Sequence, residues 1–343
     1  MGGRVRNLNT KDTASSNTST SSVDLHRDFW RWRDAYPGGP YWVHVQPTDV
    51  HWPYNPAPAY AQLFISADET TRLRDWGARL SAEGWDVFDR GFHTTGIDRH
   101  EFYRLLQRMY DQSMVHNDYQ LGRLVDHLKA TGEWQNTLLI VTADHSINNA
   151  TGVDMAAGML AQPPPPWALE TPMFRPSISR VPLIIVWPGH IAGRQRFDRA
   201  VSLIDLLPTV LDLTGMPKAE VAQGQSLVPL LRGQPGWTER PVVLDQFTRN
   251  ATTNELEGRL EVVDGRWGAT MQIGPPDRDP ERRRPWPVMV FDLWNDPICV
   301  KPINEQRPDL VTKYTKFLED TWKDHQTLAK RFTPGGQKTL TPE

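Results

Sequence analysis

The 343-residue chain has a single cysteine, little net charge and no long apolar run. Cys299 has no second cysteine to pair with, so an intramolecular disulfide is excluded. A formal net charge of -3 provides no electrostatic attraction for nucleic acid. No apolar run approaches the roughly 20 residues of a transmembrane helix, and residues 1–24 lack the apolar core of a signal peptide. We therefore expect a globular protein that binds neither nucleic acid nor a membrane.

Apolar periodicity predicts an α/β fold. Apolar runs predict strands over residues 40–45, 138–141 and 183–186. Helical spacing predicts helices over residues 68–83, 98–132 and 203–213. Asp98 followed by Glu101 is a capping-box pattern that marks the start of the second helix. Because a helix that leads directly into a strand is typical of parallel sheets, we expect a mostly parallel central sheet flanked by helices.

The last third of the chain has a different pattern. Short strands, with the turn sequence Asp264-Gly265 between two of them, predict a small antiparallel sheet over residues 242–245, 259–263, 270–273 and 288–293. An amphipathic helix over residues 308–327 is expected to close this sheet. The predicted organisation is a disordered polar tail (1–28), an α/β domain (29–232), a C-terminal subdomain (233–330) and a second tail (331–343).

The stretch Asn136 to His145, N-T-L-L-I-V-T-A-D-H, places a carboxylate and an imidazole side by side at the end of an apolar strand. In open α/β sheets ligands bind where strands end, so Asp144 and His145 are candidate metal ligands. An Asp-His pair in this place also occurs as a cap or as a hydrogen-bonding pair in a loop. The dipeptide by itself leaves both interpretations open.

Three segments resemble the sulfatase family of the alkaline-phosphatase superfamily. They are residues 110–145, residues 180–190 (R-V-P-L-I-I-V-W-P-G-H) and residues 201–213 (V-S-L-I-D-L-L-P-T-V-L-D-L). The resemblance extends over residues 40–322 and implies that Asp144 and His145 bind a divalent cation. Calcium is the expected cation, since oxygen ligands suit it, and magnesium is an alternative. An imidazole among the ligands favours manganese or zinc instead, so the identity of the metal stays open.

Two further residues enter through this resemblance. His51, in P-T-D-V-H-W-P-Y-N-P, resembles the family histidine that assists departure of the leaving alcohol, as a hydrogen-bond donor or general acid. The alternative is a loop histidine bonded to backbone, and Val50 stands where the family usually has proline. Where the family has a sulfate-binding lysine this chain has Thr171, with Arg175 as the nearest cation. Arg175 either contacts the sulfate in its place or is a surface arginine.

The chain departs from the family in lacking any Cys-x-Pro-x-Arg or Ser-x-Pro-x-Arg segment, which carries the nucleophile. Formylglycine, made from that cysteine, is therefore absent from this chain. Cys299 lies in D-L-W-N-D-P-I-C-V, which matches a late structural element of the family. Without an activated nucleophile we expect no turnover by this polypeptide alone, and its expected partner is a missing N-terminal half.

The resemblance implies a metal-dependent hydrolase whose substrates are small-molecule or saccharide sulfate esters. Family members act in the periplasm, outside the cell or in lysosomes, but this sequence shows no export signal, so its compartment is not assigned. Two alternatives remain. The first is a phosphodiester or phosphonate monoester hydrolase of the same superfamily. The second is a non-catalytic binding protein that retained the scaffold.

Overall fold

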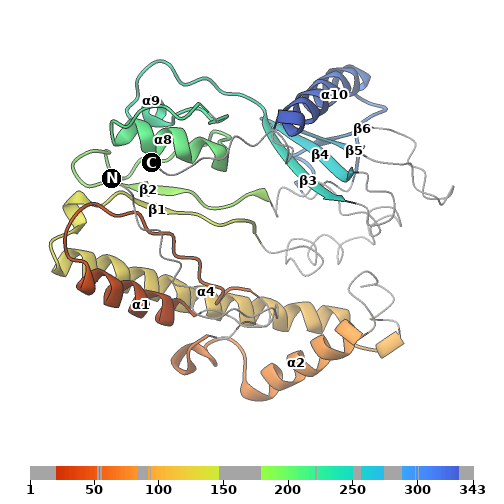
Figure 1. Ribbon diagram of the computed structural model, residues 1–343. Coiled ribbons are helices and arrows are strands. Elements are labelled where there is room, and N and C mark those ends of the chain that lie inside the picture. Colours follow the sequence, from red (N-terminus) through yellow and green to blue (C-terminus); the bar gives the residue numbers. More distant parts are fainter. Residues whose placement is uncertain are drawn as a thin grey trace. The chain divides into compact units, whose positions relative to one another are not determined.

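The computed structural model describes residues 21–51, 54, 56–82, 92, 94–146, 179–220, 222–249, 256–273, 288–297, 299 and 301–331. The chain divides into two compact units. Unit 1 comprises residues 1–137 and 147–160, and unit 2 comprises residues 138–146 and 161–343. Helices α1, α2 and α4 belong to unit 1, and the labelled strands belong to unit 2 (Figure 1). The predicted domain boundary at residues 232 and 233 stays a prediction.

The described part of unit 1 is helical. Its elements are α1 (Ser22–Ala35), η1 (Pro58–Tyr60), α2 (Ala67–Ala82), α4 (Arg99–Ala130) and η3 (Trp134–Asn136). The start of α4 is confirmed, because Asp98 is its N-cap and accepts from the backbone N–H groups of His100 and Glu101. Residues 22–28 were predicted to belong to a tail, which is wrong, since the Ser21 hydroxyl caps α1 and Phe29 is buried.

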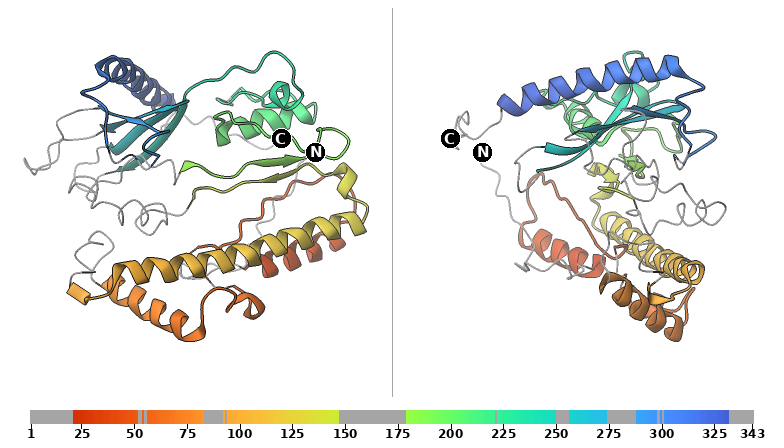
Figure 2. Two further views of the ribbon diagram at one scale, coloured as in Figure 1. Left: turned by 180° about the vertical axis from the view of Figure 1, so that it is seen from behind. Right: turned by 90° about the vertical axis from the view of Figure 1, so that its right-hand side faces the viewer.

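The core of unit 1 lies between α2 and α4, which run side by side (Figure 2). Leu73 and Leu105 are fully buried there, together with Phe102 and Met109. The predicted strand over residues 40–45 is wrong, because the segment forms no ladder with another strand in the part of the chain that the structure describes. Its residues do alternate between half-buried and exposed, so the sequence indicated the burial pattern and not the pairing.

Unit 2 begins with two short strands, β1 (Leu139–Val141) and β2 (Ile184–Val186), which pair antiparallel. Every strand pair among the described residues is antiparallel, so the predicted mostly parallel sheet is not observed there. The physical reason for the error is that a helix before a strand establishes the strand, whereas strand direction depends on a partner and its crossover. The coarser α/β class, helices combined with sheets, is present.

Beyond β2, a helical region is organised around one buried carboxylate. It contains η5 (Leu203–Asp205), α8 (Leu206–Leu213) and α9 (Val228–Leu231), so the predicted helix over residues 203–213 is confirmed. Asp205 is 2% exposed and accepts hydrogen bonds from the backbone N–H groups of Ser202 and Gln225 and from the Arg240 guanidinium. The carboxylate thus satisfies donors from three separate segments.

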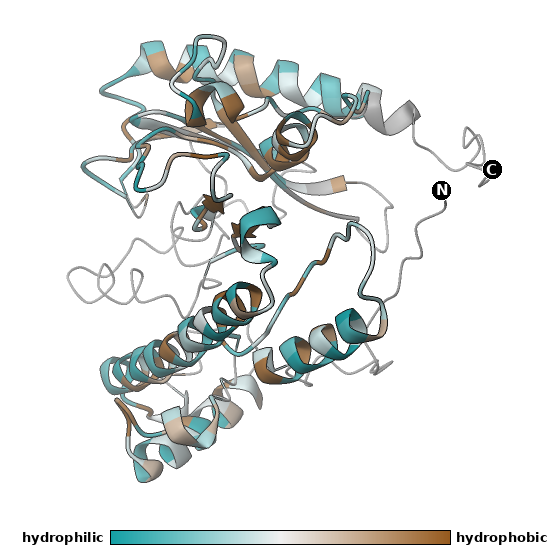
Figure 3. Ribbon diagram, turned by 90° about the vertical axis from the view of Figure 1, so that its left-hand side faces the viewer, coloured by the Kyte–Doolittle hydropathy of each residue, from teal (hydrophilic) through white to brown (hydrophobic). Residues whose placement is uncertain are grey.

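The C-terminal region matches the sequence prediction. Four antiparallel strands follow one another in space, β3 (Val242–Arg249), β4 (Leu256–Asp264), β5 (Trp267–Ile273) and β6 (Val288–Asp292). The amphipathic helix α10 (Pro308–Arg331) packs on this sheet through Leu310, Tyr314 and Leu318. Figure 3 shows hydrophilic and hydrophobic residues interspersed along this helix. Within the described ranges no helix combines the length and apolarity that a membrane crossing requires.

The opposite face of this sheet carries a second apolar cluster, which includes Met289 and Phe291, and two charged residues of β4 lie on this face. Glu261 and Arg259 alternate with the core residues of β4, and Glu261 lies opposite Leu244 of β3 and Thr270 of β5. Burial raises the pKa of Glu261 to about 7, and the Arg259 charge opposes this rise.

We expect Glu261 to make stability depend on pH. The folded chain holds the Glu261 proton more tightly than the unfolded chain, where the ordinary pKa is 4.5. The free energy of unfolding should therefore fall as pH rises from 4.5 to about 7, by about 1–3 kcal/mol. Urea denaturation across this range checks it, and Glu261→Gln should remove the decrease. The exposed Glu305→Gln is the control, and an equal decrease in Glu261→Gln would contradict the assignment.

Candidate functional site

Asp144 and His145 lie just beyond β1, separated from its last residue, Val141, by two residues. Both side chains are exposed, 61% for Asp144 and 47% for His145, so a solvent ion can reach them. Asp144 Oδ1 accepts from the backbone N–H of His145 at 2.9 Å, which fixes the start of the turn. The second oxygen, Oδ2, lies 3.8 Å from Nε2 of His145. The two groups are therefore brought together at one point on the surface of unit 2.

The hydrogen bond of the ring determines which nitrogen can bind a metal. Nδ1 of His145 is 2.6 Å from the carbonyl oxygen of Ser146, which can only accept, so we assign the proton to Nδ1. Nε2 then carries the lone pair. In metal sites a ligating histidine usually donates its other N–H to a carbonyl or carboxylate. The tautomer and orientation of His145 therefore suit a ligand.

The pair provides part of a coordination shell. Metal–ligand distances are roughly 2.0–2.5 Å, so two donors 3.8 Å apart can contact one cation after a small rotation. Calcium takes six to eight oxygen ligands and zinc takes four in all. In the described part of the chain no group of three or more His, Cys, Asp or Glu side chains gathers to hold a metal. Asp144 and His145 fit a cation as an incomplete set of ligands.

His51 lies in a turn of unit 1, and its placement relative to the Asp144–His145 pair in unit 2 is not fixed. Its N–H donates to the Thr48 carbonyl at 3.0 Å, and its carbonyl accepts from the Tyr54 N–H at 2.8 Å. Its side chain is exposed. Tyr54 is buried with a φ of 53°, a conformation that is uncommon for residues other than glycine. The Tyr54 ring packs edge-on against Tyr110, so tertiary packing holds this turn.

Two residues before His51, the buried Asp49 connects this turn to two helices. Its Oδ2 accepts from the backbone N–H of Ser22, at the start of α1, with a distance of 2.8 Å. Its Oδ1 lies 3.5 Å from Nδ1 of His116 on α4, and both side chains are 1% exposed. On its other side, Nε2 of His116 is 3.3 Å from the amide nitrogen of Gln120. A carboxylate at a helix N-terminus is also favoured by the helix dipole.

Sequence reasoning missed Asp49 and His116. They are separated by 67 residues, so no local pattern links them. A signal was present on α4, where the polar residues Gln112, His116 and Gln120 recur every four residues and so share a helix face. All three are buried. A polar row at helical spacing inside an otherwise apolar stripe thus indicated a buried hydrogen-bonding partner.

Arg175 and Cys299, the two remaining residues considered from the sequence, add no evidence for a catalytic site. Arg175 lies outside the described residues. Cys299 is fully buried with a φ of 56°, in agreement with a structural role and not with that of a nucleophile.

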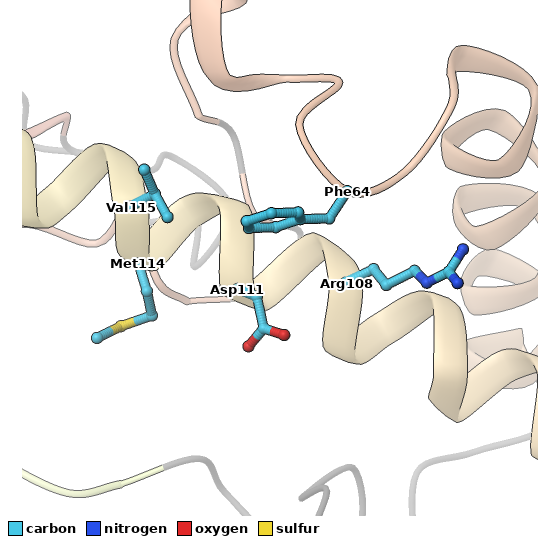
Figure 4. Close-up of a pocket in the computed structure, with 5 residues that line it drawn as sticks. All are labelled: Phe64, Arg108, Asp111, Met114 and Val115. Carbon is cyan, nitrogen blue, oxygen red and sulfur yellow. The ribbon is translucent and has the colours of Figure 1, made fainter.

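A shallow pocket on unit 1 does not correspond to the predicted site (Figure 4). Arg108, Asp111, Met114 and Val115 of α4 line it, together with Phe64 from the segment before α2. Burial raises the pKa of Asp111. None of the predicted site residues contributes to this lining.

Comparison with known families identifies the chain. The sequence model of the sulfatase family matches residues 9–216, more than half of the chain. A second model, described as N-sulphoglucosamine sulphohydrolase, C-terminal, matches residues 168–267. The chain belongs to the sulfatase family. The membership that the motifs predicted is therefore confirmed.

Individual relatives agree with this membership. Arylsulfatase K of Danio rerio is 34% identical over 131 residues, which are 38% of this chain and 22% of that protein. An arylsulfatase of Clostridium perfringens is 26% identical over 215 residues, 60% of this chain and 40% of that protein. N-acetylglucosamine-6-sulfatase of Homo sapiens is 25% identical over 218 residues, which are 62% of this chain and 36% of that protein. The chain thus spans less than half the length of these relatives.

Solved structures show the shared fold. The phosphonate monoester hydrolase of Agrobacterium radiobacter superposes with a TM-score of 0.61 at 22% identity, covering 94% of this chain and 66% of that chain. A 2-O GAG sulfatase superposes with a TM-score of 0.50 at 20% identity. The superposition covers 68% of this chain and 46% of that sulfatase. Both likenesses support an α/β alkaline-phosphatase-like fold.

We expect Asp49→Ala to destabilise unit 1. The substitution leaves the buried N–H of Ser22 without its acceptor, which costs about 1–3 kcal/mol. Chemical denaturation followed by circular dichroism measures the loss. The matched control is Asp24→Ala in α1, whose carboxylate is 54% exposed in its ion pair with Arg27, and which should change stability by less than about 0.5 kcal/mol. Equal stabilities of the two variants would show that Asp49 does not hold the turn.

Proposed function

We propose that this chain forms part of a metal-dependent hydrolase of sulfate esters, with small-molecule or saccharide sulfates as substrates. The observation that carries the proposal is the Asp144–His145 pair just beyond β1. The pair lies inside the stretch that the sulfatase family matches. Relatives named arylsulfatase and N-acetylglucosamine-6-sulfatase support an aryl or sugar sulfate as substrate.

In this proposal Asp144 and His145 hold a divalent cation, calcium first, with manganese, magnesium or zinc as alternatives. A bound cation would neutralise the negative charge on the sulfuryl oxygens. Asp144 contributes Oδ2 and His145 contributes Nε2, while the Ser146 carbonyl keeps Nδ1 protonated. The remaining ligands come from water and from residues outside the described set.

His51 has the proposed role of assisting the leaving group. A solvent-exposed imidazole can donate a proton to the departing alcohol oxygen near neutral pH. The support is its exposure on a turn that Asp49 and Tyr54 hold in place. Arg175 is proposed as a contact to the sulfate on the family resemblance alone.

We place the nucleophile outside these 343 residues, because they contain no Cys-x-Pro-x-Arg or Ser-x-Pro-x-Arg segment. A missing N-terminal half that carries formylglycine would supply it. The same half would contribute the strands with which β1 and β2 form a mostly parallel central sheet. The support is that the matched stretches span 22% and 40% of two arylsulfatase relatives.

We expect the chain to bind Mn²⁺ weakly, with a Kd on the order of 1 mM, because two protein ligands leave most of the shell to water. Asp144→Ala and His145→Ala should each weaken binding by ~10-fold or more. Electron paramagnetic resonance of free Mn²⁺ measures this without any need for turnover. Asp198→Ala, an 81% exposed aspartate in the same unit, is the control and should bind as the parent chain does. Unchanged binding in Asp144→Ala would refute the metal site.

We expect no metal-stimulated hydrolysis of 4-nitrophenyl sulfate by the 343-residue chain, since it lacks a nucleophile. A chain extended before Met1 to include Cys-x-Pro-x-Arg, with its cysteine converted to formylglycine, should hydrolyse the ester. Asp144→Ala in the extended chain should lower kcat/KM by ~10–100-fold. Release of nitrophenol is the measurement. Turnover by the unextended chain would contradict the proposed division of the active site.

The same experiment separates the alternatives. Competition between 4-nitrophenyl sulfate and 4-nitrophenyl phenylphosphonate distinguishes a sulfatase from a phosphonate monoester hydrolase, whose fold this chain shares. An extended chain that binds no metal and hydrolyses neither ester would favour the non-catalytic binding protein.

A further inference from the structure

Unit 2 carries a row of alternating indole and guanidinium groups at one rim of its four-stranded sheet. Cζ of Arg266 lies 4.7 Å from the ring centroid of Trp267 and 5.6 Å from that of Trp294. Cζ of Arg307 lies 4.9 Å from the Trp267 ring. The residues come from the β4–β5 turn, from the segment after β6 and from the residue before α10. Three loops that are distant in sequence thus build one surface.

Carboxylates hold both guanidinium groups in place. Arg266 donates through Nε and Nη2 to Asp292, and Arg307 donates through Nε and Nη2 to Asp309. Arg266 holds the pKa of Asp292 well below its ordinary value. The backbone of the rim is fixed as well, because Asp292 Oδ1 accepts from the Trp294 N–H at 3.2 Å. Bidentate pairing and stacking together immobilise each arginine before any ligand arrives.

Each arginine retains unused donors. A guanidinium has five N–H groups, and in both residues the bonds to carboxylate use Nε and Nη2. No described residue accepts a hydrogen bond from Nη1 of Arg266 or Arg307. The two side chains are 40% and 38% exposed, so these donors face solvent. They can donate to the oxygens of an external anion.

The indole beside them is unusually exposed. Trp294 is 75% exposed, and its ring presents an apolar face next to the Arg266 guanidinium. A flat apolar ring next to fixed N–H donors suits a ligand with an apolar face and anionic substituents. A sugar ring has such a face of C–H groups, and a sulfate substituent has oxygens that accept from a guanidinium.

We propose that Trp294, Arg266 and Arg307 form a binding surface for a sulfated saccharide, with Trp294 stacking on a sugar ring and the arginines contacting its sulfate groups. The ligand class rests on the proposed function, since a sulfate ester hydrolase of saccharides meets such chains. Asp292 and Asp309 balance the two arginine charges. Recognition is therefore short-range, through hydrogen bonds and stacking, and not through a broad positive field.

The test measures binding of a sulfated heparin tetrasaccharide to the full 343-residue chain by isothermal titration calorimetry in EDTA. We expect Trp294→Ala and Arg307→Ala each to weaken binding at least ~5-fold. Two matched controls are exposed residues that make none of the contacts of this surface. Trp42→Ala removes an 80% exposed tryptophan of unit 1, and Arg196→Ala removes an 85% exposed arginine. Both should leave the affinity unchanged, and thermal unfolding verifies that each variant is folded.

Three results would overturn the proposal. The first is that the parent chain does not bind the sulfated tetrasaccharide. The second is that the variants and their controls lose the same affinity for it. The third is that an unsulfated tetrasaccharide of the same backbone binds as tightly as the sulfated one. Because EDTA removes any cation, the outcome does not depend on Asp144 and His145. Saccharide binding without Mn²⁺ binding would refute the proposed function and leave the proposed surface intact. Mn²⁺ binding without saccharide binding would refute the surface and leave the proposed function intact.

Discussion

Unit 1 depends on one buried carboxylate. Asp49 ties the turn of His51 to the first backbone N–H of α1 and faces His116 in the middle of α4. A buried polar group is costly unless it is hydrogen-bonded. Oδ2 of Asp49 accepts from the Ser22 N–H, whereas Oδ1 lies 3.5 Å from Nδ1 of His116 without a hydrogen bond among the described residues. The hydrogen bond from Ser22 fixes the backbone of the His51 turn, which no strand ladder holds in the described part of the chain. Turn geometry here comes from a side chain and not from a sheet.

In unit 2 the four-stranded sheet is held together by pairing between strands that are neighbours in sequence. Its four strands follow one another through the chain and in space, and Gly265 and Arg266 turn β4 directly into β5. Such a sheet needs no distant partner, and α10 covers its apolar face. The strand before Asp144 and His145 is different, because β1 pairs with β2 over three residues alone. The strand that precedes the candidate metal ligands is therefore paired over fewer residues than the strands of the C-terminal sheet.

This contrast explains what could be predicted from the sequence. Alternation and a two-residue turn predicted the C-terminal sheet, and capping at Asp98 predicted the start of α4, since these signals are local. Strand pairing over residues 40–45 and the direction of β1 failed, because both depend on partners distant in sequence. The Asp49–His116 contact was missed for the same reason, although the polar row on α4 indicated that a buried partner existed.

The family resemblance is confirmed, whereas the choice between a metal site and a loop pair at Asp144 and His145 stays a prediction. The geometry is compatible with the metal interpretation, because the Ser146 carbonyl lies next to Nδ1 and leaves Nε2 as the nitrogen nearer to Asp144 Oδ2. The same contact between Nδ1 and a backbone carbonyl occurs at His190 with Pro188, so it does not by itself distinguish a metal ligand from a loop histidine. Two ligands remain too few for a tight site. In the proposed enzyme, further ligands would have to join Asp144 and His145 for the cation to bind tightly.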